Sequence, residues 1–75
     1  MQFNYIALGS VIRRIRTKRG LSQEVLSGLA GIARTHLTMI ENGTKAPNLE
    51  ILYRIAQALD MTASQLLALS EKESQ

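Results

Sequence analysis

Apolar residues recur at helical spacing in five stretches of the chain, three or four positions apart. This spacing is that of the inward face of an α-helix. A residue suited to capping a helix precedes four of the stretches, and apolar residues bracket each cap. The four caps are Asn4, Ser22, Asn48 and Thr62. The pattern predicts an all-α chain folded as a compact five-helix bundle with short loops.

The rest of the chain is organised around Leu21 to Gly43. Ser22 is expected to cap one helix, and Gly31 to end it, since glycine adopts left-handed backbone at little steric cost. Leu37 and Ile40 then form the buried face of a second helix. Two helices joined by so tight a turn are typical of the helix-turn-helix that reads DNA.

The outward face of the second helix is polar once Leu37 and Ile40 point inward. It holds no acidic side chain and no large aliphatic residue, which suits contact with base edges in a major groove. Met39 is the apolar member and is expected to contact a thymine methyl group. The predicted base-reading residues are Arg34, Thr35, His36, Thr38 and Met39.

The second helix starts without a capping side chain, because Ala33 stands at the cap position. Arg34 follows, and a cation at a helix N-terminus opposes the macrodipole. Two interpretations stay open. Either neighbouring packing tolerates both residues, or a DNA phosphate meets the open N–H groups while Arg34 contacts a phosphate or a guanine edge.

Polar residues on both sides of this helix are candidates for contact with the DNA backbone. Gln23 opens the first helix, where its amide and the adjacent N–H groups would reach one phosphate; the alternative is an ordinary exposed glutamine. The loop residues that follow the second helix are either backbone clamps or turn residues. The predicted phosphate-binding set is Ser22, Gln23, Asn42, Thr44 and Lys45.

Four short motifs carry a resemblance to a known family. They are GLSQ at 20–23, LAGIAR at 29–34, IENG at 40–43 and the P-x-L-x-x-L run from Pro47 to Leu52. Together they resemble the phage-repressor/Cro-like helix-turn-helix family, also called the xenobiotic-response-element family, over residues 6–69. The chain's size and its ARTHL run are similar to controller proteins of restriction–modification systems.

The resemblance implies a lambda-repressor-like DNA-binding domain that acts as a sequence-specific transcriptional regulator. It also implies that Arg16 and Glu41 pair and tie the reading helix to the scaffold. The alternatives on the same fold are a phage-type repressor, an antitoxin or a protein-interaction module. A protein-interaction module would show no salt-dependent DNA binding.

The charge distribution adds a second, weaker sign of DNA binding. The net charge is +3 and the isoelectric point is about 9.8. Five of the nine basic residues lie between Arg13 and Arg19, and no acid precedes Glu24. A basic N-terminal half is expected of a phosphate-binding face, although a solvated helix face has the same composition.

Length and composition limit the number of domains and the classes of function that the chain can have. Its 75 residues predict one domain over 1–75, with an ordered core at about 4–69 and a frayed tail at 70–75. The chain has no cysteine and one histidine, and no nucleophile–base pair, so we expect no metal, no cofactor and no enzymatic activity. No secretory signal or membrane-length apolar run is present, which predicts a cytoplasmic, nucleoid-associated protein without membrane contact.

The expected partners are double-stranded DNA, a second copy of the chain and RNA polymerase. Ile51, Leu67 and Leu69 fall outside the narrow inward stripes of their helices. Such surplus apolar residues are typical of an interface, although partial burial under the tail is an alternative. We expect a homodimer, through the last helix and the adjoining side of the preceding one, on a palindromic operator whose half-sites lie about 34 Å apart.

Overall fold

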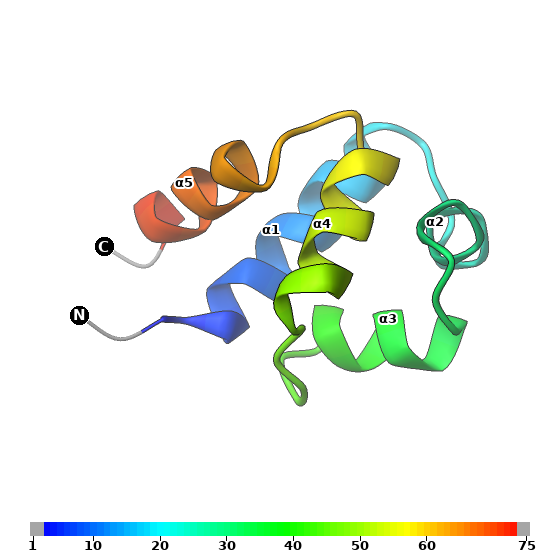
Figure 1. Ribbon diagram of the computed structural model, residues 1–75, viewed down its shortest axis with the longest axis horizontal. Helices are drawn as coiled ribbons and strands as arrows, with labels where there is room; N and C mark the ends of the chain where they lie inside the picture. Colours follow the sequence, from blue (N-terminus) through cyan, green and yellow to red (C-terminus); the bar gives the residue numbers. More distant parts are fainter. Residues whose placement is uncertain (1–2, 74–75) are drawn as a thin grey trace.

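The computed structural model describes residues 3–73, and within them every regular element is an α-helix. The helices are α1 (Tyr5–Lys18), α2 (Gln23–Ala30), α3 (Arg34–Glu41), α4 (Leu49–Ala58) and α5 (Ala63–Glu73). Figure 1 shows α4 between α2 and α5, with α1 behind it and α3 below. α5 packs on α1, α2 packs on α4, and α3 packs on both α1 and α2. The all-α prediction is confirmed.

The predicted caps form hydrogen bonds with backbone N–H groups at the helix starts. Asn4 Oδ1 accepts from the N–H of Ala7 at 3.0 Å, and Ser22 Oγ accepts from the N–H of Val25 at 3.1 Å. Asn48 caps α4 in the same way. At α5, Thr62 and Gln65 bond reciprocally at 3.0 Å, which is the capping box that the sequence predicts.

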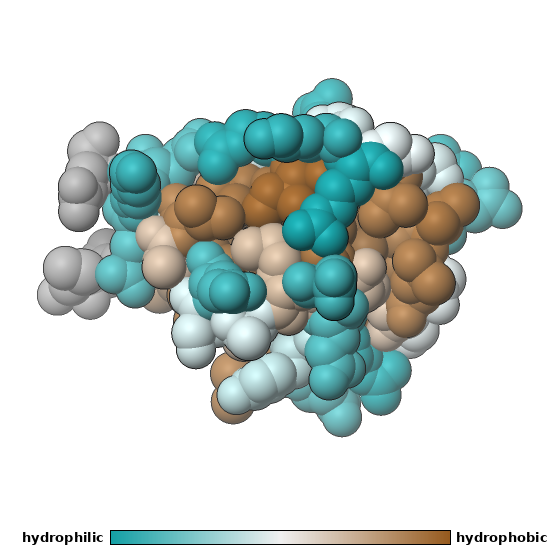
Figure 2. Space-filling model, turned by 90° about the horizontal axis from the view of Figure 1, so that it is seen from above, coloured by the Kyte–Doolittle hydropathy of each residue, from teal (hydrophilic) through white to brown (hydrophobic). Residues whose placement is uncertain are grey.

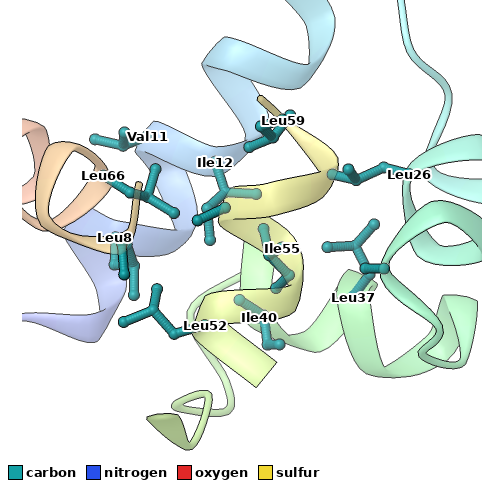
Figure 3. Packing of buried hydrophobic residues seen from close by; sticks show 13 residues of the cluster. Leu8, Val11, Ile12, Leu26, Leu37, Ile40, Leu52, Ile55, Leu59 and Leu66 are labelled. Carbon is teal, nitrogen blue, oxygen red and sulfur yellow. The ribbon is translucent and has the colours of Figure 1, made fainter. Parts of the chain in front are cut away.

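The core is aliphatic and draws side chains from every helix (Figure 3). Ile55 of α4 lies among residues of α2 and α3, while Leu66 of α5 lies beside α1. The residues labelled in Figure 3 are Leu8, Val11, Ile12, Leu26, Leu37, Ile40, Leu52, Ile55, Leu59 and Leu66. Because Leu37 and Ile40 are fully buried in this core, the opposite face of α3 turns outward.

The C-terminal tail is more ordered than the sequence predicts. α5 continues to Glu73 instead of ending near Leu69. Ser70 is buried, and the Glu73 carboxylate forms an ion pair with Arg14 of α1. The expected frayed tail at 70–75 is therefore wrong over 70–73, because α5 has α1 to pack against; residues 74–75 lie outside the described residues.

The three apolar residues expected at a dimer interface are only partly exposed. Ile51, Leu67 and Leu69 all pack against the core, so partial burial applies to each of them. Arg54 of α4 donates to the carbonyl of Gly31 at the end of α2. Helical periodicity places Ile51 toward this side of α4, and its role in a dimer interface stays a prediction.

None of the helices within residues 3–73 is long and apolar enough to cross a membrane.

Candidate nucleic-acid interface

The turn between α2 and α3 sets the angle of the candidate reading helix. Gly31 ends α2 in left-handed backbone (φ 70°, ψ 34°), which glycine adopts without a Cβ clash. The N–H of Ile32 then donates to the carbonyl of Ser27 at 3.0 Å. Ile32 packs against the core and anchors the chain as it turns. The burial of Leu37 and Ile40 fixes the rotation of α3 about its axis.

Four of the predicted base-reading side chains are free to meet a ligand. Arg34 and Thr35 are exposed, Met39 is 39% exposed, and His36 is half-buried. Within residues 3–73, none of these four side chains makes a hydrogen bond or ion pair. They form a polar surface with one flexible apolar residue, as the sequence predicts for the outward face of α3.

Some of the predicted phosphate-binding side chains are hydrogen-bonded within the fold, and others are not. Asn42 and Lys45 are exposed, and neither side chain has a hydrogen bond or ion pair within the described part of the chain. Ser22 caps α2, and Thr44 Oγ1 donates to the carbonyl of Met39 at 3.1 Å. Asn42 and Lys45 are thus the loop side chains that are available to contact a DNA backbone.

Behind the reading face lies the expected pair of Arg16 and Glu41. Arg16 Nε is 2.7 Å from Glu41 Oε2, and a second guanidinium nitrogen of Arg16 donates to Glu41 Oε1 at 3.0 Å. The exposed fractions of the two side chains are 10% and 0%. Arg16 also donates to the carbonyl of Leu21 at 2.8 Å. The pair therefore links α1, the α1–α2 turn and the end of α3.

Gln23 is half-buried and belongs to the same hydrogen-bond network. Its Nε2 donates to Glu41 Oε1 at 3.0 Å, and its Oε1 accepts from Thr38 Oγ1 at 2.9 Å. Thr38 Oγ1 also lies 3.0 Å from the carbonyl oxygen of Arg34. Both ends of the Gln23 amide therefore bond to α3, and contact of its second N–H with a phosphate stays a prediction.

The start of α3 has the backbone geometry of a capped helix without the capping side chain. Ala33 has φ −68° and ψ 143°, and no side chain accepts a hydrogen bond there. Ser22 and Asn48, which do cap their helices, have similar extended backbone. The N–H groups of the first turn of α3 are consequently left to solvent or to a ligand.

The basic cluster between Arg13 and Arg19 contributes less to a phosphate-binding face than its charge suggests. Arg16 is paired with Glu41, Arg14 is paired with Glu73, and Arg19 donates to the carbonyl of Leu59. Three of the five cations in this cluster therefore act within the fold. Within residues 3–73, no three His, Cys, Asp or Glu side chains are grouped so that they could hold a metal ion.

Comparison with known families agrees with this geometry. Residues 12–66 match the sequence model of the HTH_3 family, described as helix-turn-helix. The chain belongs to this helix-turn-helix family. The matched residues span the whole of α2, α3 and α4, and therefore include the candidate interface.

Several proteins that are similar to this chain are controllers of restriction–modification systems. The control protein C.MunI of Mycoplasma sp. is 35% identical over 69 residues, covering 91% of this chain and 93% of that protein. The crystal structure of the restriction–modification controller protein C.AhdI from Aeromonas hydrophila is 34% identical, with a TM-score of 0.80 over 83% of this chain and 94% of that one.

A third relative in the helix-turn-helix family was solved with DNA. The restriction–modification controller protein C.Esp1396I, as a tetramer in complex with its natural 35 base-pair operator, is 25% identical to this chain. Its TM-score is 0.86, covering 97% of this chain and 96% of that one. The five-helix fold described above is thus shared with these controllers.

Proposed function

We propose that this chain is a sequence-specific DNA-binding transcriptional regulator that reads an operator with α3. The observation that carries the proposal is the outward face of α3, where Arg34, Thr35 and Met39 are exposed and unengaged beside an uncapped helix start. Arginine pairs with guanine edges, and apolar side chains contact thymine methyl groups. Asn42 and Lys45 flank this face and would bind the phosphate backbone.

We further propose that the chain acts as the controller of a restriction–modification system. The likeness to C.MunI and C.AhdI supports this role, as does the operator complex of C.Esp1396I. In that role the chain would work in the cytoplasm, on the nucleoid, and would act on RNA polymerase either by blocking it or by contacting it. Transcription in vitro from a promoter that carries the bound sequence distinguishes the two modes.

The proposed operator is a palindrome bound by a homodimer, because one helix-turn-helix reads too few base pairs for tight binding at physiological salt. The contact must leave both copies of α3 free for DNA. Leu49 and Tyr53 are one turn apart on α4 and are 66% and 53% exposed. Helical periodicity places them on the side of α4 away from the Arg54–Gly31 contact with α2. Figure 1 shows α5 on the side of α4 opposite α2. We propose that this pair, with Leu67, meets the second copy.

The test is selection of bound sequences from a random duplex pool, followed by titration at several salt concentrations. We expect a palindromic consensus and affinity that falls steeply with salt, because phosphate contacts release counterions. Weak binding with no consensus and no salt dependence would contradict the proposal and favour a protein-interaction module.

A further inference from the structure

Thr38 lies at the edge of the outward face of α3 that borders the start of α2. Its hydroxyl lies 2.9 Å from Gln23 Oε1 and 3.0 Å from the carbonyl oxygen of Arg34. Both partners are acceptors, so the single hydroxyl hydrogen of Thr38 is committed within the protein. Thr38 therefore has no hydrogen to donate to a base edge while these bonds persist.

The orientation of the Gln23 amide follows from Glu41. A carboxylate only accepts hydrogen bonds, so the NH₂ group of Gln23 must face Glu41 Oε1, at 3.0 Å. The amide oxygen is then left facing Thr38. Glu41 is itself held by two hydrogen bonds from Arg16. A chain of hydrogen bonds thus runs from α1 through Glu41 and Gln23 to the hydroxyl of Thr38.

Building on the proposed function, we propose that Thr38 determines specificity by contacting the 5-methyl group of a thymine with its own methyl group. Gln23 is the positioning residue, which keeps the hydroxyl turned toward α2. One rotation about χ1 places both the hydroxyl and the methyl of threonine, so a fixed hydroxyl also fixes the methyl. The methyl is then the part of the Thr38 side chain that makes an apolar contact in the major groove.

The experiment uses the duplex selected from a random pool and replaces each thymine in turn by deoxyuridine, which lacks only the 5-methyl group. At the thymine of each half-site that Thr38 contacts, the parent chain should lose about fourfold in affinity, the value of one buried methyl group. Thr38→Ser should abolish this loss, whereas Thr38→Val should keep it. Thr17→Ser, at an exposed threonine of α1 outside the reading face, is the matched control and should also keep this loss.

Gln23→Met tests the positioning role, because it preserves the approximate shape of the side chain and removes both amide hydrogen bonds. The thymine-to-uracil affinity ratio at the Thr38 position should fall but stay above one, because the bond of Thr38 to the Arg34 carbonyl remains, and the ratios at the other thymines should stay unchanged. A residue that only contacts a phosphate would weaken all duplexes equally and leave every ratio unchanged, which would overturn the positioning role.

The possible failures are separable. A Thr38→Ser variant that keeps the parent's ratio at every thymine overturns the methyl contact but leaves the proposed DNA-binding function standing. A parent chain that binds no duplex overturns both. Circular dichroism of each variant shows whether it retains the helical fold, and Thr38→Val gives a second measurement of the methyl contact that does not depend on the hydroxyl.

Discussion

At Gly9 the backbone of α1 packs directly against the backbone of α3. A Cβ atom at this position would lie 2.0 Å from the carbonyl oxygen of Ile40, and the obstacle is backbone, which cannot rotate away. We expect Gly9→Ala to destabilise the fold by about 1–3 kcal/mol, the usual cost of overpacking, despite the better helix propensity of alanine. Urea unfolding measures the change.

Gly28 is the matched control for Gly9. It lies within α2 and is exposed, and a Cβ atom at this position would meet no neighbouring side chain or helix within 4 Å. Gly28→Ala should therefore stabilise the fold by about 0.5–1 kcal/mol through helix propensity. Equal stability of the two variants would show that α1 and α3 do not meet at Gly9.

Single side chains of the reading face should separate base contacts from backbone contacts. Arg34→Ala or Thr35→Ala should cost about 1–3 kcal/mol on the preferred duplex and relax its consensus. Lys45→Ala should weaken binding to all sequences alike and reduce the number of counterions released on binding by about one. Repeated selection and salt titration of each variant provide the measurement. An unchanged consensus for Arg34→Ala and Thr35→Ala would show that these side chains of α3 do not contact the bases.

At the scale of the element, the start of α3 combines a capping backbone with a residue that cannot cap. Because Ala33 already has the extended conformation found at Ser22, a serine or aspartate there needs no rearrangement to accept from the first turn. Ala33→Ser and Ala33→Asp should each stabilise the free protein by about 0.5–2 kcal/mol. Thermal unfolding measures this gain, and Ser22→Ala provides the opposite change at α2.

The aspartate variant should also bind DNA less tightly than the serine variant, since its charge would stand beside a phosphate. Binding titrations of the two variants at one salt concentration compare them. If Ala33→Ser lowers the melting temperature, the first turn of α3 is held in some other way. If serine and aspartate bind DNA equally well, no phosphate lies near this helix start.

The elements could be predicted because their signals are local. A cap and its N–H partner are three residues apart, and Gly20 and Gly31 take left-handed backbone where the helical pattern stops. Contacts between helices carry no such signal. The partners of Gln23 lie 15 and 18 residues away, and Glu73 finds Arg14 at a separation of 59. For this reason neither the bonds of Gln23 to α3 nor the helical structure of residues 70–73 was predicted from the sequence, and Gly9 was not singled out.

At the scale of the whole molecule, apolar surface remains after the core is complete. Figure 2 looks onto the face opposite α3 and shows apolar surface over α5 and α2, framed by hydrophilic residues. Two exposed pairs have the same spacing of four residues, Leu49 with Tyr53 on α4 and Val25 with Leu29 on α2. We propose that the second copy binds at the first pair, on the side of α4 away from the Arg54–Gly31 contact.

The two pairs make a matched test of the dimer. Leu49→Glu with Tyr53→Glu places two charges in the proposed interface, and both residues are exposed enough for the monomer to keep its fold. Sedimentation should show a dimeric parent and a monomeric double variant, because unpaired charges resist burial. Val25→Glu with Leu29→Glu adds the same charge on α2, where the exposed fractions are 47% and 63%, and should remain dimeric. A parent that stays monomeric at high micromolar concentration contradicts the proposal, and so does an α2 variant that dissociates as readily as the α4 variant.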